Sequence, residues 1–125
     1  MHLYIELWKT RPAWHALSVA ERESYVAQLG PAIGQLLANG VELLGFALAD
    51  AEAPYDAGYT YLAAWRMPDL ERARALEAAV DGAGWHRYFE QVNARGAIVS
   101  PPEVLAHMAR GSQPAAAPGP ATGAA

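Results

Sequence analysis

The chain has 125 residues, which fits one domain, and its composition excludes several classes of protein. Hydrophobic residues make up 53% and charged residues 18%, and no apolar run reaches about 18 positions, so we expect a globular protein without a membrane span. The net charge of −4 argues against a nucleic-acid partner, since phosphates would be repelled on average. The absence of cysteine excludes disulfides and thiolate chemistry, and the absence of a leader-like N-terminal segment predicts a cytoplasmic location.

The first predicted element is a strand over residues 2–8 whose two faces differ. Side chains alternate between the faces of a strand, which gives one aliphatic face and one aromatic, acidic face. We expect the aliphatic face to pack under helices and the aromatic face to need a second cover, as a pocket or a subunit interface. The aliphatic face carries Leu3, Ile5 and Leu7, and the aromatic face carries Tyr4, Glu6 and Trp8.

A polar linker over residues 9–17 precedes the first predicted helix. Ser18 and Glu21 form a capping box, which marks the start of that helix, and Asn39-Gly40 marks its end. Pro31 inside the helix predicts a kink near Gly30.

The remaining elements follow from apolar spacing and turn residues. Nearly continuous apolar residues over 41–49 predict a strand that is covered on both sides, and a loop over 50–58 connects it to a third strand over 59–67. A second helix begins after Pro68-Asp69. We further expect a short helix with Trp85, Tyr88, Phe89 and Val92 on one face, a strand over 97–99, a helix over 100–111 opened by Ser100, and a disordered tail over 112–125.

The predicted order βαββαβ is that of a ferredoxin-like α+β fold with an antiparallel sheet, an extra short helix before strand four and a C-terminal helix. Over residues 2–110 the chain resembles the dimeric α/β-barrel superfamily, and it most closely resembles a small uncharacterised bacterial family within it. The stretches that carry the likeness are His2-Leu3-Tyr4-Ile5-Glu6-Leu7-Trp8, Tyr61-Leu62-Ala63-Ala64-Trp65-Arg66-Met67-Pro68 and Gly84-Trp85-His86-Arg87-Tyr88-Phe89-Glu90-Gln91-Val92-Asn93.

The resemblance implies a homodimer and a range of activities. Members include cofactor-free monooxygenases, muconolactone-type isomerases, haem-degrading enzymes, haem-dependent chlorite dismutases and domains without known activity. Their ligands lie between the sheet and the helices or in the barrel mouth, but none of their catalytic motifs matches this chain residue by residue. We therefore expect the aromatic side chains of Tyr4, Trp8, Tyr61 and Trp65 to be covered by pairing of two subunits.

Glu6 and His86 are the candidate catalytic residues. A carboxylate flanked by Tyr4 and Trp8 would be partly desolvated, which raises its pKa and suits a general base. His86 stands next to the aromatic cluster, where imidazole could carry a proton or bind haem iron, or it faces solvent. The alternative for Glu6 is an ion pair with an arginine such as Arg66, across the sheet or across the dimer. Candidate ligand-binding residues are Tyr4, Trp8, Tyr61, Trp65 and Arg66.

Several kinds of chemistry lack their signatures. No Gly-x-Ser-x-Gly elbow surrounds Ser18, Ser24 or Ser100, and Lys9 is not part of a phosphate-binding loop. The histidines form no three-ligand cluster, so we expect no metal and no cofactor. Three functions stay open: a cofactor-independent monooxygenase or isomerase acting on an aromatic or enolisable molecule, a non-catalytic dimeric module, and haem binding at His86 or His107.

Overall fold

The computed structural model describes residues 1–111, and the predicted tail over 112–125 lies outside them. The described chain forms a four-stranded antiparallel sheet and five helices. In chain order they are β1 (His2–Thr10), α1 (Pro12–His15), α2 (Val19–Ala38), β2 (Glu42–Leu48), β3 (Tyr61–Met67), α3 (Leu70–Gly82), α4 (Trp85–Tyr88), β4 (Phe89–Ala97) and α5 (Pro101–Arg110).

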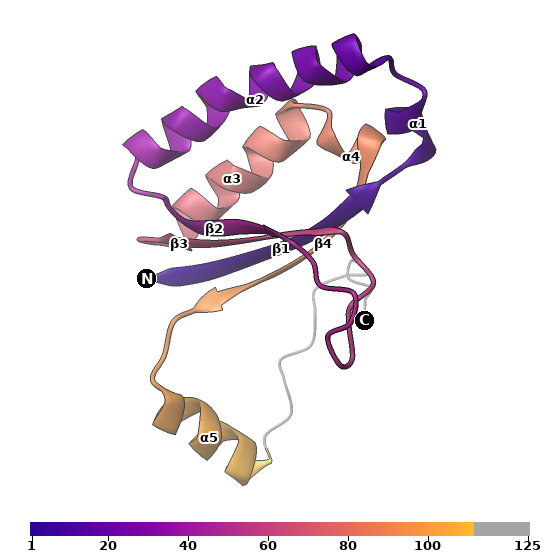
Figure 1. Ribbon diagram of the computed structural model, residues 1–125. Helices are drawn as coiled ribbons and strands as arrows, with labels where there is room; N and C mark the ends of the chain where they lie inside the picture. The colour runs from indigo at the N-terminus through magenta and orange to yellow at the C-terminus, as the bar shows by residue number, and fades with distance from the viewer. Residues whose placement is uncertain (112–125) are drawn as a thin grey trace.

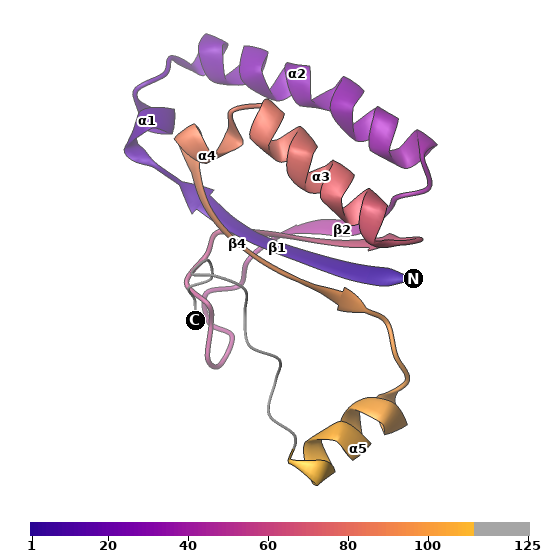
Figure 2. The ribbon, with the colours of Figure 1, turned by 180° about the vertical axis from the view of Figure 1, so that it is seen from behind.

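The strands are arranged in the order β2-β3-β1-β4, with β1 and β3 in the centre and β2 and β4 at the edges. Figures 1 and 2 show α2 and α3 side by side over one face of the sheet, while α5 lies on the opposite side, away from the strands. This confirms the predicted ferredoxin-like fold, including the short helix before the last strand and the C-terminal helix. None of the helices in residues 1–111 is long and apolar enough to cross a membrane.

The ends of α2 form where the sequence predicts them. The Ser18 hydroxyl accepts a hydrogen bond from the Glu21 backbone N–H at 3.1 Å, and the Glu21 carboxylate accepts one from the Ser18 N–H at 2.8 Å, which completes the capping box. Helix α2 then continues through Pro31 and ends at Asn39 and Gly40, where the φ of +91° suits glycine.

The prediction for residues 85–99 is wrong in one respect. The helix that was expected to carry Phe89 and Val92 ends at Tyr88, and the last strand begins at Phe89 instead of Ala97. The cause is non-local: the segment pairs with all of β1, from Thr10 opposite Phe89 to His2 opposite Ala97. This ladder satisfies the backbone hydrogen bonds of a segment whose apolar spacing also fits a helix.

The assignment of the two sheet faces is also wrong. Tyr4 is 1% exposed and Trp65 is 3% exposed within a single chain, because their face of the sheet lies under the helices. The uncovered face is the aliphatic one, where Leu3 is 39% exposed. Both faces of β1 are apolar, so alternation alone does not tell which of them the helices cover. Strand β2 is an edge strand with Leu44, Phe46 and Leu48 exposed, which corrects the expectation of two covered sides.

Candidate functional site

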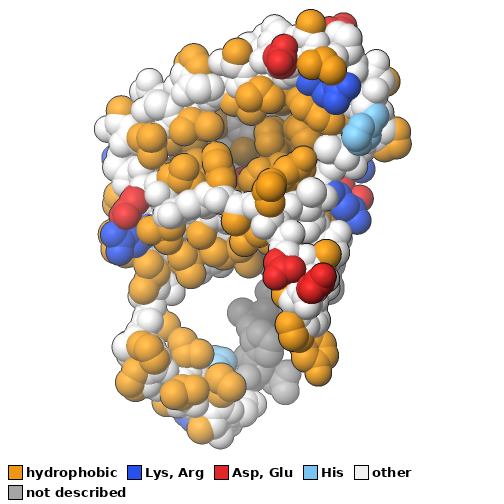
Figure 3. All heavy atoms as spheres, in the orientation of Figure 1, with side chains coloured by type: hydrophobic (Ala, Val, Ile, Leu, Met, Phe, Trp, Pro, Cys, Tyr) orange, Lys and Arg blue, Asp and Glu red, His pale blue; other side chains and the backbone are white. Residues whose placement is uncertain are grey.

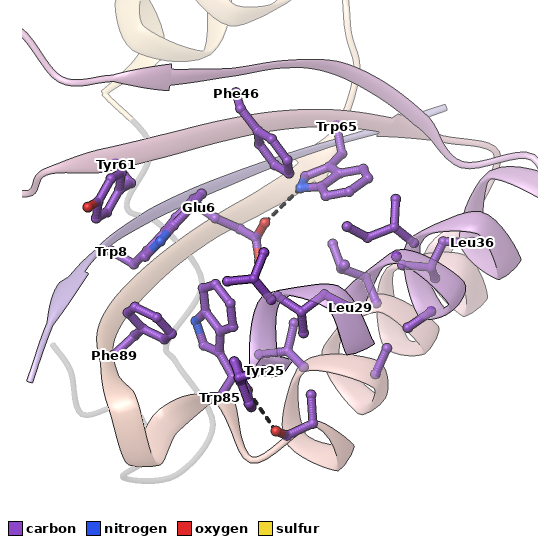
Figure 4. A pocket seen from close by; sticks show the side chains of 18 of the residues that line it. Glu6, Trp8, Tyr25, Leu29, Leu36, Phe46, Tyr61, Trp65, Trp85 and Phe89 are labelled. Carbon is purple, nitrogen blue, oxygen red and sulfur yellow. Dashed lines mark hydrogen bonds between the residues drawn. The ribbon is translucent and has the colours of Figure 1, made fainter. Parts of the chain in front are cut away.

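A pocket of about 470 Å³ lies between the sheet and the two covering helices. Figure 3 shows a hollow surrounded by hydrophobic side chains above the sheet, and Figure 4 shows rings from the strands facing aliphatic side chains of α2. The volume is within the range of small-molecule sites. Its lining consists of Glu6, Trp8, Trp14, Tyr25, Val26, Leu29, Gly30, Ala32, Ile33, Leu36, Phe46, Tyr61, Trp65, Leu76, Ala79, Val80, Ala83, Trp85 and Phe89.

Aromatic rings from several elements pack against each other to form the sheet side of this pocket. Trp8 stacks on Tyr61 with ring centroids 5.6 Å apart and meets Trp85 edge to face at 5.7 Å. Phe46 meets Trp65 edge to face at 5.9 Å. On α2, Leu36 is the one buried side chain, so most of that helix is not packed tightly against the rings. Space for a ligand remains between them.

Glu6 is the one carboxylate of the lining, and it is 6% exposed. The Trp65 indole Nε1–H donates to one carboxylate oxygen at 2.7 Å, and the Gln91 amide donates to the other at 2.9 Å. Burial raises the pKa of Glu6, and the hydrogen bonds from Trp65 and Gln91, together with the charge of His86, oppose this rise. A raised pKa is the change expected for a carboxyl group that acts as a general base.

Gln91 is itself held in place by its neighbours. The Trp85 indole Nε1–H donates to the Gln91 side-chain oxygen at 2.6 Å, and the Gln91 amide also donates to Asn93 at 2.8 Å. A chain of hydrogen bonds therefore runs from Trp85 through Gln91 to Glu6 and fixes the orientation of the carboxylate.

A second, smaller hollow of about 90 Å³ also has Glu6 in its wall and is polar. There the Tyr4 hydroxyl donates to Glu77 at 2.8 Å, and Arg95 pairs with Glu77 at 2.9 Å. Burial, and then the hydrogen bond to Glu77, raise the pKa of Tyr4 well above its usual range. His86 also lines this hollow, with its Nε2 at 3.8 Å from Asp81.

The structure gathers most of the predicted site residues but not all of them. Trp8, Tyr61 and Trp65 line the large pocket with Glu6, whereas Tyr4 and His86 line the small hollow. Arg66 is exposed, lies on the uncovered face, and pairs with Glu42 through its Nε at 3.0 Å. Within the chain, Arg66 therefore does not pair with Glu6 across the sheet, which corrects that alternative.

Sequence reasoning missed Gln91 as the second donor to Glu6. It also missed the contribution of α2, which faces the pocket with Tyr25, Leu29 and Ile33. The apolar spacing in α2 was visible in the sequence, but this helix was expected to pack on the aliphatic face of β1 and not on its aromatic face. The role of Gln91 follows from its position opposite Trp8 in the β1–β4 register, which no local pattern gives.

The lining of the large pocket lacks the histidine and the cationic side chains that commonly hold haem. Haem in proteins needs an axial ligand, such as histidine, and its propionates favour cationic partners. The lining residues include no histidine, lysine or arginine, and His107 lies on α5, on the other side of the sheet. Within residues 1–111, no group of three or more His, Cys, Asp or Glu side chains is placed to hold a metal ion.

Known structures are similar to this chain at low sequence identity. A mutant chlorite dismutase from Candidatus Nitrospira defluvii has a TM-score of 0.64 and 13% identity, over 87% of this chain and 47% of that one. A second protein named as a chlorite dismutase, TA0507, has a TM-score of 0.62 and 11% identity, over 86% of this chain and 48% of that one. HapK from Hahella chejuensis is 16% identical over 94% of this chain and all of that one, with a TM-score of 0.43.

The chain thus spans about half the length of the chlorite dismutase chains, and at these identities the likeness extends to the fold alone. The shared fold is ferredoxin-like, with a four-stranded antiparallel sheet and helices over one of its faces. No curated protein sequence matches the chain. The model of a family of unknown function, DUF6616, matches residues 1–111, and the chain therefore belongs to that family.

Proposed function

We propose that this protein binds a small aromatic or enolisable molecule in the large pocket and that Glu6 acts there as a general base, without a cofactor. The observation that carries the proposal is a single buried carboxylate in a pocket of about 470 Å³ whose other walls are mainly apolar. Desolvation raises the pKa of Glu6, which makes its carboxylate a stronger base than one in water.

The chemistry follows from the position of the carboxylate. Glu6 takes a proton from an acidic carbon, and the electron pair of the broken C–H bond stays on the substrate as an enolate. Protonation at a different carbon completes an isomerisation, whereas reaction with O₂ leads to an oxygenated product. Anthrone is a suitable probe, because its acidic methylene is flanked by aromatic rings and it reacts with O₂ to give anthraquinone and water.

Binding is tested with 2-naphthol by isothermal titration calorimetry. Leu29 on α2 lines the pocket, whereas the preceding residue, Gln28, is exposed and does not. Leu29→Trp fills the pocket and should weaken binding more than about tenfold, while Gln28→Trp should leave it unchanged. Equal binding by both variants, with their helix content intact by circular dichroism, would place the ligand elsewhere.

Catalysis is tested by the exchange of deuterium into the anthrone methylene, followed by NMR under nitrogen. Wild-type protein should speed the exchange over buffer, and Glu6→Gln should lower the protein-dependent rate by about 100-fold or more. Glu52→Gln, in an exposed loop, is the matched control. If the exchange is the same in the Glu6 variant, the carboxylate is not a base and the protein is a non-catalytic binding module.

A homodimer is the second part of the proposal, with the uncovered sheet face as its interface. That face carries Leu3 and Val92, both more than one third exposed, and the half-buried Ile5 and Leu7 between them. Helix α5 lies on the same side and exposes Val104, Leu105 and Met108. Apolar surfaces of this extent on both elements favour burial against another chain, and a second copy supplies the complementary apolar face.

Light scattering after size exclusion tests the dimer. Wild type should have about twice the 13.4 kDa chain mass, and Leu3→Asp should reduce it to one chain. Val19→Asp, an exposed valine on α2, is the control and should stay dimeric. A monomeric wild type at micromolar concentration would refute this part of the proposal and leave the pocket untouched.

A further inference from the structure

The charges around the large pocket are unbalanced. Glu6 is a potential anion in the lining, and none of the lining residues is a lysine, arginine or histidine. The nearby Arg95 is paired with Glu77, on the side of the small hollow. His86, whose charge acts on Glu6, also lies on that side. A ligand carboxylate or sulfonate in the large pocket would therefore be desolvated beside Glu6 with no cationic side chain in the lining, which is costly.

Three hydrogen-bond donors of the pocket wall are used by the protein itself. The Trp65 indole donates to Glu6, the Trp85 indole donates to Gln91, and the Tyr25 hydroxyl donates to the Ala83 carbonyl at 2.7 Å. Figure 4 shows the Tyr61 hydroxyl pointing away from Glu6. None of these four groups is directed to a ligand acceptor next to the carboxylate. The indoles of Trp8 and Trp14 also line the pocket, but they carry no positive charge to balance an anion.

The acceptor capacity of the pocket, in contrast, is not used up. The two oxygens of a carboxylate accept about four hydrogen bonds. Glu6 receives two from side chains, one from Trp65 and one from Gln91. A ligand with an O–H or N–H group at its buried end completes this set, and the surrounding rings then cover its apolar body.

We propose that the pocket selects uncharged aromatic ligands that present a phenol, enol or ring N–H donor to Glu6, and that it rejects aromatic anions. This proposal rests on the binding site proposed above and names the class of ligand for it. The donor is bound by Glu6, the planar body lies among Trp8, Trp65 and Phe46, and α2 covers the outer side.

Three naphthalene derivatives of similar size test the proposal: 2-naphthol with a donor, 2-methoxynaphthalene without one, and 2-naphthoate with a negative charge. At neutral pH the naphthol should bind about tenfold more tightly than the methoxy compound, since a hydrogen bond to a charged acceptor is among the stronger ones. The naphthoate should bind more weakly than either. Calorimetry or ligand-observed NMR measures all three.

The variant Glu6→Gln separates the role of the carboxylate from that of the apolar walls. It should reduce the preference for naphthol over methoxynaphthalene to about threefold or less, while the affinity for methoxynaphthalene stays within about twofold. Naphthoate binding as tightly as naphthol, or naphthol and methoxynaphthalene binding equally to wild type, would overturn the selectivity and leave the site in place. Failure of all three to bind would overturn the site itself.

Discussion

Replacing Glu6 by glutamine should change how the stability of the fold depends on pH. Burial raises the pKa of this carboxyl above its value in the unfolded chain, so the folded state holds the proton more tightly. The protonated Glu6 carboxyl contributes fully to stability when the pH is below the pKa of the unfolded chain. This contribution is lost as the pH rises through the pKa of the folded state. Glutamine does not titrate. The stability of Glu6→Gln relative to wild type should therefore improve as the pH rises above the range in which an ordinary glutamate titrates.

The size of the effect has two parts. Glutamine offers one carbonyl oxygen where Glu6 offers two, so either Trp65 or Gln91 loses its acceptor, at a cost of about 1–3 kcal/mol. Each unit by which burial raises the Glu6 pKa returns about 1.4 kcal/mol to the variant at high pH. A loss of 1 kcal/mol lowers the Tm of a domain of this size by about 4 °C. The Tm of the variant should therefore be about 4–12 °C below that of wild type in acid. At higher pH this Tm difference should narrow by roughly 5 °C for each unit by which burial raises the pKa of Glu6.

The assay is thermal unfolding followed by circular dichroism at fixed protein concentration, because a dimer would make Tm depend on it. Glu52→Gln, in the exposed loop between β2 and β3, is the control and should follow wild type at every pH. A constant Tm difference between Glu6→Gln and wild type across the range would mean that the buried carboxyl titrates as it does in the unfolded chain, and the reasoning on its environment would be refuted.

Three further substitutions test individual contacts. Trp65→Phe removes a hydrogen-bond donor that favours the charged form of Glu6 and so lowers its pKa. The substitution should lower the free energy of unfolding by about 1–3 kcal/mol at neutral pH and by less in acid, and an equal loss at both pH values would contradict this. Tyr4→Phe removes the hydroxyl bound to Glu77, which should cost about 1 kcal/mol in urea unfolding and remove the latest tyrosine transition from an alkaline absorbance titration. Ser18→Ala should cost about 1 kcal/mol in the same unfolding assay, and no loss would mean that the capping box is not needed for α2.

Local signals in the sequence predicted the order of the main elements, but not the short helix α1, which lies in the expected linker over residues 9–17. The starts of α2, α3 and α5 follow from Ser18, Asp69 and Ser100. Each of these side chains accepts a hydrogen bond from the backbone N–H of the residue three positions further along the chain. These contacts involve neighbours along the chain, so their chemistry is visible in the sequence itself. Glu6 was identified as a desolvated carboxyl for a similar reason, since Tyr4 and Trp8 flank it on the same strand.

What the sequence did not predict depends on partners far along the chain. Strand β4 begins at Phe89 because it pairs with β1, and Asn93 and Gly96 within it give no strand pattern. The covered face of β1 depends on α3, whose Glu77 accepts the hydrogen bond of Tyr4 from 73 positions away. An aliphatic stripe is as suitable for a subunit interface as for a core, so hydrophobicity alone could not separate the two.

The observed faces make ligand binding and dimerisation separable. Alternate residues of β1 point in opposite directions: Glu6 and Trp8 face the pocket, while Leu3 and Ile5 face the uncovered side. The sequence-based hypothesis made the cavity depend on two chains, but the pocket wall of this structure comes from one chain. A Leu3→Asp monomer should consequently keep its affinity for 2-naphthol. If that affinity falls in parallel with the dimer, the partner chain must reach or brace the pocket, and the division of β1 into a binding face and an interface face is wrong.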